Sequence, residues 1–329
     1  MRKTILYVLS LVIICFAIPM LLTKQFKHKE VMAEPTEISS MVDYNYKEYD
    51  TIKLLHKKTN EIEQINLDEY LYGVVSAEMP VDYDIEALKA QAIVARTYTL
   101  YKVINDPQKH GDANICDDST CCQAWISKED RLARWDQEKQ NENWEKIVSA
   151  VNATAGKIVI YNGKPINAFF HSNSGGKTEM PINVWGGRDY PYLQSVETSG
   201  EENYEHYSSE VQLTKQELFN KVKEKYANLE INLDDNTQIQ ILDNTESGRV
   251  KTLKVGNVNL SGVEARTLFG LRSTNFEIQI ENDIVKFSVI GYGHGVGLSQ
   301  TGSDSLAKQG KNAEEIIKHF YQGVEIINY

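Results

Sequence analysis

Glu78 is the residue of this chain whose neighbours most favour acid–base chemistry. It is the only charged residue in the mostly apolar run LYGVVSAEMP, residues 71–80. A carboxyl surrounded by Val, Ala and Met side chains loses hydration of its charged form, so its pKa should rise. A glutamic acid with a raised pKa can act as a general acid near neutral pH. The alternative is a glutamate at a helix end that points into solvent, as most glutamates do.

A glycine-rich run near the C-terminus carries a histidine and a glutamine. It reads GYGHGVGLSQ, residues 291–300, and contains His294 and Gln300. Its four glycines lose much conformational entropy on folding, which a special backbone path or the close approach of a ligand would justify. The run is not a dinucleotide-binding loop, because the spacing GxGxxG and a βαβ context are both absent. A purely structural histidine is the alternative.

Two further runs contain polar residues that could take part in chemistry. In FFHSNSGGKT, residues 169–178, an apolar strand leads to His171 and a loop of hydroxyls and glycines. A serine–histidine hydrolase is possible, but the GxSxG signature is absent, and hydrogen bonding to sugar hydroxyls is an equally good interpretation.

Arg96 is the only charge in the helical run AQAIVARTY, residues 90–98. A half-buried arginine needs an acceptor, which a substrate oxygen or a structural salt bridge would supply.

Capping signals predict two consecutive helices around Glu78. Asn66, followed three residues later by Glu69, resembles a capping box for a helix that ends before Pro80. Asp84 then caps a longer helix over residues 85–105. Glu78 is therefore predicted to lie at the junction of two packed helices, where a carboxyl can be held rigidly.

The remaining signals predict an α+β fold. Hairpins are expected over residues 51–66 and around residues 162–163, and a smaller inserted subdomain at about residues 200–260. The elements show no βαβ alternation, so a doubly wound parallel sheet is not expected. A cleft built from helices and antiparallel strands would hold the motifs.

The first residues predict a membrane anchor. Residues 4–22 form an uncharged run of 19 residues after Arg2 and Lys3, close to the roughly 20 that cross a bilayer as a helix. The basic N-terminus predicts that this end is cytoplasmic and that the body is extracytoplasmic. A cleaved signal peptide is the alternative, but a long charged segment precedes its candidate cleavage site at residues 31–33. We expect a stub and anchor at residues 1–23, a tether at 24–49 and a catalytic domain at 50–329.

The charge of the chain argues against a nucleic acid partner. Residues 30–329 contain 30 basic and 46 acidic residues, a net charge of −16. Such a surface repels phosphate backbones. It is compatible with a polar substrate outside the cell that is not itself strongly anionic.

An irregular stretch at residues 106–136 contains three cysteines, Cys116, Cys121 and Cys122, and His110. An extracytoplasmic protein usually oxidises paired cysteines, but three is an odd number. A disulfide between Cys116 and either Cys121 or Cys122 would leave one free thiol, and a disulfide between the adjacent Cys121 and Cys122 would be strained. The alternative is a structural zinc ion held by His110, Cys116 and Cys122, with Cys121 as a substitute ligand. We favour zinc, with no part in the chemistry.

Four of these motifs occur together in one known family. The runs SAEMP at 76–80, AQAIVARTY at 90–98, HSNSGG at 171–176 and GYGHGVGLSQ at 291–300 closely resemble the stage II sporulation protein D family. Its members are membrane-anchored peptidoglycan lytic transglycosylases of endospore-forming bacteria. The resemblance covers roughly residues 50–329, and the four motifs follow in the family's order.

The resemblance implies a reaction, the cleavage of bonds between N-acetylmuramic acid and N-acetylglucosamine to leave 1,6-anhydro ends. Glu78 falls on the family's catalytic glutamate, which serves as both acid and base because the sugar's own 6-hydroxyl is the nucleophile. A hydrolase would need a second carboxylate, such as Glu179 or Asp189. The residues expected to position substrate and support Glu78 are Arg96, His171, His294 and Gln300. Those expected to bind substrate are Tyr98, Ser172, Ser174, Gly175, Gly176, Tyr292 and Ser299.

The resemblance also implies a biological setting. During engulfment of the forespore, the family works beside an amidase/endopeptidase, stage II protein P, and a membrane protein, stage II protein M. The amidase removes stem peptides, so denuded glycan strands are the expected substrate. A glycan-binding module that stimulates an amidase without cutting is the alternative function, since related domains occur in amidase enhancers.

Overall fold

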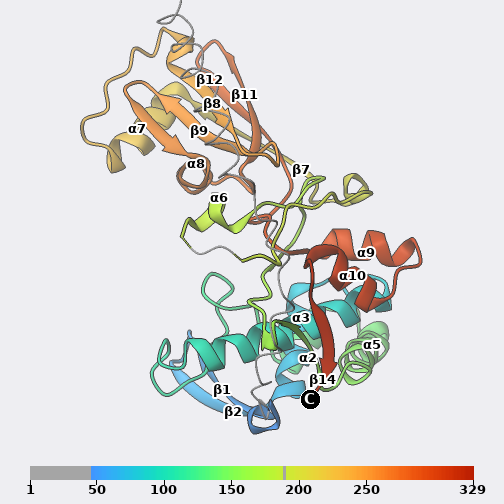
Figure 1. The fold of residues 1–329 in the computed structure, drawn as a ribbon. Helices are drawn as coiled ribbons and strands as arrows, with labels where there is room; N and C mark the ends of the chain where they lie inside the picture. The colour runs from blue at the N-terminus through green and yellow to red at the C-terminus, as the bar shows by residue number, and fades with distance from the viewer. Residues whose placement is uncertain (1–45, 188–189) are drawn as a thin grey trace, which may run out of the picture. The chain divides into compact units, whose positions relative to one another are not determined.

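The computed structural model describes residues 46–187 and 190–329, and Figure 1 shows their arrangement. The structure is a mixed α+β fold with mainly antiparallel sheets, as predicted. None of the helices in the described residues combines the length and the apolar composition that a membrane span requires. The predicted span at residues 4–22, and most of the predicted tether, lie outside the described residues.

Helices and strands are mixed along the chain. The helices are α2 (Leu67–Glu78), α3 (Ile85–Asn105), α4 (Lys128–Leu132), α5 (Gln140–Asn152), α6 (Pro181–Trp185), α7 (Lys215–Lys225), α8 (Gly262–Phe269), α9 (Gln300–Lys308) and α10 (Ala313–Phe320). The strands are β1 (Thr51–His56), β2 (Glu61–Asn66), β3 (Ile115–Cys116), β4 (Lys157–Tyr161), β5 (Lys164–Pro165), β6 (Phe170–His171), β7 (Ser208–Thr214), β8 (Ile239–Asn244), β9 (Val250–Val255), β10 (Val258–Ser261), β11 (Asn275–Glu281), β12 (Ile284–Ile290), β13 (Leu298–Ser299) and β14 (Glu325–Asn328).

Helix α3, with 21 residues, lies at the centre of the helical part of the structure. Helices α2, α5, α9 and α10 and strand β4 all pack against it (Figure 1). The side chains of Asn66 and Asp84 cap α2 and α3 as predicted, although Asn66 does so without the reciprocal bond of a capping box. Because α2 ends at Glu78 and α3 packs against α2, the prediction that Glu78 lies at a helix junction is confirmed.

Short sheets join parts of the chain that are distant in sequence. The predicted hairpin of β1 and β2 is present, and β3 pairs with β1 in parallel. The C-terminal strand β14 pairs with β4. Strands β6 and β13 pair in parallel, which places Ser299 opposite His171. This last pairing brings the two histidine-containing runs of the sequence together.

A second hydrophobic core forms between two three-stranded sheets and two helices. One sheet has the order β11-β12-β7 and the other β10-β9-β8, with α7 and α8 beside them. Leu218, Phe269 and Phe287 are fully or almost fully buried in this core. The core continues through β11 and β12, so this part of the chain extends beyond the predicted boundary at residue 260.

Gly73 allows the chain segment that follows the cysteines to lie directly against α2. A Cβ atom at Gly73 would lie 2.2 Å from Trp125 Nε1 and 2.7 Å from the carbonyl oxygen of Ile126. These contacts are too short for any side chain larger than glycine. The close approach brings the backbone of Ala124 to the C-terminal end of α2, beside Glu78.

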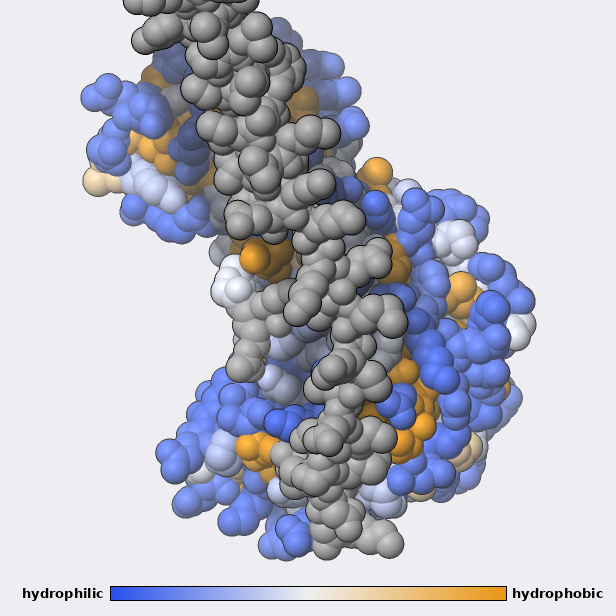
Figure 2. Space-filling model, in the orientation of Figure 1, coloured by the Kyte–Doolittle hydropathy of each residue, from blue (hydrophilic) through white to orange (hydrophobic). Residues whose placement is uncertain are grey.

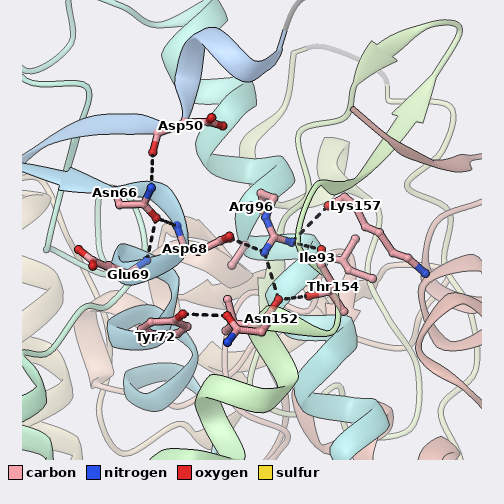
Figure 3. Close-up of polar contacts among 12 residues, drawn as sticks. Asp50, Asn66, Asp68, Glu69, Tyr72, Ile93, Arg96, Asn152, Thr154 and Lys157 are labelled. Atoms are coloured by element: carbon pink, nitrogen blue, oxygen red, sulfur yellow. Dashed lines mark hydrogen bonds and ion pairs between the residues drawn. The ribbon is translucent and has the colours of Figure 1, made fainter.

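Arg96 is fully buried and connects α3 to the ends of three other elements (Figure 3). Its Nη2 forms an ion pair with Asp68 at 2.8 Å, in the first turn of α2. Its Nη1 donates to the carbonyl oxygens of Thr154 at 2.8 Å and Lys157 at 3.3 Å. The prediction that Arg96 lies in the cleft is therefore wrong. The salt-bridge alternative is correct, because the guanidinium satisfies acceptors at the end of α5 and the start of β4.

Replacing Arg96 with lysine tests this structural role. A single ammonium cannot reach acceptors that a planar guanidinium joins. We expect Arg96→Lys to lower the free energy of unfolding by about 1–3 kcal/mol, measured by urea denaturation. The isolated folded protein should keep its function at low temperature. Unchanged stability together with lost function would contradict the structural role.

Candidate active site

Two neighbouring cavities share Glu78. The first, here called the histidine cavity, has a volume of about 470 Å³ and is lined in part by Tyr98, His171 and His294. The second, here called the arginine cavity, has a volume of about 430 Å³ and is lined in part by Arg131 and Trp135. Residues common to both cavities are Ala77, Glu78, Ser172 and Gln300.

The carboxyl of Glu78 is held by two hydrogen-bond donors from other parts of the chain. The backbone N–H of Ala124 donates to Oε1 at 2.7 Å, and Nε2 of Gln300 donates to Oε2 at 3.2 Å. Burial raises the pKa of Glu78 above its usual value, and these two donors limit the rise because they favour the carboxylate. The predicted direction of the pKa shift is confirmed, and the predicted support from Gln300 is present as a direct contact.

The two histidines form one wall of the histidine cavity, with ring centroids 5.6 Å apart. His171 Nδ1 donates to the carbonyl oxygen of Val296 at 3.1 Å, and its Nε2 lies 3.1 Å from the hydroxyl of Ser174. Burial, with a smaller effect of Arg249, lowers the pKa of His171 to about 3. Burial also lowers the pKa of His294 well below its usual value. Both imidazoles are therefore neutral near pH 7, and neither is hydrogen-bonded to Glu78.

Three of the predicted substrate-binding residues line the histidine cavity, and four do not. Tyr98, Ser172 and Tyr292 line it. The other four do not line either cavity: Ser174, Gly175, Gly176 and Ser299. The prediction is wrong for Ser174 and Ser299, because both side chains are fully buried. Two of these four have positive φ angles that glycine tolerates, 70° at Gly175 and 96° at Gly176.

Glu201 explains why these loop residues turn away from the cavities. It is fully buried, and its carboxylate accepts hydrogen bonds from the N–H groups of Ser174 and Gly176, both at 3.0 Å. It also accepts from the hydroxyls of Ser299 and Thr301. Glu201 was not predicted from the sequence, because it lies in an acidic stretch, EENYE, that is typical of a solvent-exposed loop.

The structure describes one of the two residues named above as candidates for a hydrolase's second carboxylate. Glu179 is buried and accepts hydrogen bonds from Asn183, Thr245 and Ser247, and it does not line either cavity. Asp189 lies outside the described residues. Among the described residues that line the two cavities, the only acid besides Glu78 is the exposed Asp82.

The cysteine insert forms a cluster of potential metal ligands beside the histidine cavity. The ligand atoms of His110, Cys116, Cys121 and Cys122 lie within 4.8 Å of one another, and the three cysteines are free thiols. The three predicted ligands belong to this cluster, and Cys121 lies with them as a fourth candidate ligand. Cys122 also lines the histidine cavity, so the cluster is adjacent to the wall that contains Tyr98.

Arginines and a tryptophan in the cavities were not predicted. Arg266, at the end of α8, lines the histidine cavity, and Arg131 and Trp135 line the arginine cavity. Arg131 and Trp135 could have been identified from the sequence, because they are four residues apart and follow Ser127, which caps α4.

Comparisons with known proteins indicate the same family as the four sequence motifs. Residues 55–161 match the family described as stage II sporulation protein, and residues 197–297 match a family described as a domain of unknown function. The chain is 35% identical to stage II sporulation protein D of Bacillus amyloliquefaciens over 89% of its length and 81% of that protein. It is 32% identical to stage II sporulation protein D of Bacillus subtilis over 97% of its length and 95% of that protein.

A more distant relative has a different name. The chain is 28% identical to the amidase enhancer of Bacillus subtilis over 79% of its length, but covers only 40% of that protein. The two matches that have higher identity and cover most of both proteins decide the assignment. The chain belongs to the stage II sporulation protein D family, a family of sporulation proteins.

Proposed function

We propose that this protein is a peptidoglycan lytic transglycosylase. It would cleave the bond between N-acetylmuramic acid and N-acetylglucosamine in denuded glycan strands and leave 1,6-anhydro-muramic acid ends. The observation that carries the proposal is the setting of Glu78. A single carboxyl with a raised pKa lies where two cavities meet and is held by Ala124 and Gln300.

The chemistry follows from that setting. Glu78 in its neutral form donates its proton to the glycosidic oxygen as the bond from that oxygen to the anomeric carbon breaks. The resulting carboxylate is stabilised by the N–H of Ala124 and the amide of Gln300. It then accepts the proton of the sugar's 6-hydroxyl as that oxygen bonds to the anomeric carbon. No water is consumed, and Glu78 ends in its starting protonation state.

The cavities around Glu78 suit a polymer. A third cavity, of about 680 Å³, shares Pro80, Asp82, Tyr83 and His206 with the arginine cavity. The three cavities thus form a continuous series with Glu78 between the first two, as expected for a chain cleaved in its interior. The face in Figure 2 is mostly hydrophilic where it is not grey, which is compatible with a polar substrate.

The proposed setting is the extracytoplasmic side of a membrane during forespore engulfment. An anchor at residues 4–22 would hold the protein there, and stage II proteins P and M would be its partners. The second candidate function is a non-catalytic enhancer of a partner amidase, which the similarity to an amidase enhancer favours. The two functions differ in whether Glu78 is needed for a chemical product.

Glu78→Gln tests the chemistry. Glutamine is nearly isosteric and keeps an acceptor for Ala124, but it cannot transfer a proton. We expect the rate of anhydro-muramic acid production from denuded peptidoglycan, measured by mass spectrometry, to fall by roughly 10²- to 10⁴-fold or more. Asp82→Asn is the control and should remain active. Uncut glycan with wild-type protein, together with retained glycan binding, would instead support the enhancer.

The pH dependence tests the environment of Glu78 separately. Because its pKa is higher in the folded protein than in the unfolded chain, the stability contributed by the neutral carboxyl is lost as the pH rises through the folded-state pKa. We expect Glu78→Gln to gain stability relative to wild type as the pH rises from acidic to neutral. The cleavage rate should fall over the same range, because the acid form is lost. A stability difference that does not vary with pH would contradict the raised pKa.

We also propose that the His110 and cysteine cluster binds a structural zinc ion. One histidine and three thiolates are a common tetrahedral zinc set, and the ligand atoms already lie close together. Zinc there would link β3 to the segment that precedes Ala124 and would brace the cavity wall at Cys122.

Metal analysis of the purified full chain tests the zinc site. We expect one zinc per chain, and its removal by a chelator or by Cys122→Ser should lower the midpoint of thermal unfolding. Cys15→Ser, outside the cluster, should keep the metal. A protein without zinc, in which a disulfide is mapped between these cysteines, would contradict the proposal.

A further inference from the structure

Arg131 lines the cavity that also contains Glu78, and no carboxylate among the described residues forms an ion pair with it. It belongs to the short helix α4, which the side chain of Ser127 caps. Its Nε is buried without a hydrogen-bond partner, and among the described residues its guanidinium has no ion pair or side-chain hydrogen bond. The guanidinium carbon lies 4.8 Å from the ring centre of Trp135. The arginine is thus half-buried against an aromatic ring, and no acceptor among the described residues pairs with its guanidinium.

Such an arrangement favours an anionic ligand. A partly desolvated guanidinium without a protein acceptor is unfavourable, and a planar carboxylate can accept two parallel hydrogen bonds from its donors. The carboxylates of the same cavity do not supply this partner. Glu78 is bonded to Ala124 and Gln300, and Asp82 is exposed without an ion pair to Arg131.

The proposed substrate has one group that fits. Alternating N-acetylglucosamine and N-acetylmuramic acid carry hydroxyls and acetamides, which are neutral. The only ionisable group of the glycan itself is the lactyl carboxylate of muramic acid. A stem peptide converts this group into a neutral amide, and its removal by an amidase restores the negative charge.

We infer that Arg131 binds the free lactyl carboxylate of a muramic acid residue in the arginine cavity, and so selects strands without stem peptides. Trp135 keeps the guanidinium oriented toward the cavity through its ring face. This inference rests on the proposed function, because it takes the substrate to be a peptidoglycan strand. It assigns substrate selection to a residue outside the four motifs.

Binding measurements without cleavage test the inference. The affinity of the Glu78→Gln protein, here the parent, should be measured for three ligands. These are denuded strands, the same strands with their carboxylates methyl-esterified, and chitin oligosaccharides of equal length. The parent should prefer the free acid. Adding Arg131→Gln should weaken binding of the free acid by roughly 10- to 100-fold, the loss expected for hydrogen bonds to a charged group. Binding of the ester and of chitin should not change.

Two further variants sharpen the result. Arg131→Lys keeps the charge without the planar donors and should recover part of the affinity, whereas Arg134→Gln removes an exposed arginine three residues away and should have no effect. The parent's preference for acid over ester needs no change at Arg131, so the test does not depend on that variant's folding. Equal binding of acid and ester by the parent, or an equal loss for all three ligands in Arg131→Gln, would overturn the inference. Failure of cleavage would challenge the proposed reaction, but would leave this binding comparison intact.

Discussion

The buried carboxylate of Glu201 is the constraint on which the arrangement of the candidate active site depends. It joins the loop after His171, through Ser174 and Gly176, to the start of α9, through Ser299 and Thr301. Without it, several buried donors would lose their acceptor, at a cost of about 1–3 kcal/mol each. Because Gln300 lies between Ser299 and Thr301, the same bonds hold its amide against Glu78.

The chemistry of Glu78 depends on this rigidity and on the end of α2. The helix ends at Glu78, and the absence of a side chain at Gly73 lets the segment around Ala124 lie against the helix. The carboxyl of Glu78 is thereby shielded from water, which raises its pKa and favours the neutral acid. The two hydrogen-bond donors stabilise the carboxylate that forms when the proton is transferred. The neutral histidines shape the cavity beside it without adding a competing charge.

The sequence predicted features that depend on neighbours along the chain. The apolar run around Glu78 and the caps at Asn66 and Asp84 are of this kind, and the structure confirms them. The cysteine spacing is also of this kind, and the structure brings the three cysteines and His110 together. Features that depend on distant partners were not predictable. Arg96 could have bound either substrate or Asp68. The packing of α2 on α3 decides between them, and the sequence of α3 alone does not predict that packing. The residue types of a substrate-binding loop are present at Ser174, Gly176 and Ser299. These residues instead donate hydrogen bonds to Glu201, which lies in an acidic stretch typical of an exposed loop.

The most direct test of the central claim is digestion of denuded peptidoglycan in water labelled with a heavy oxygen isotope. If Glu78 is the sole acid and base and the 6-hydroxyl is the nucleophile, mass spectrometry will show 1,6-anhydro-muramic acid ends without the label. Reducing ends that carry the label would contradict the account, because they would require an activated water. The exposed carboxylate of Asp82 would then be the residue to examine as its base.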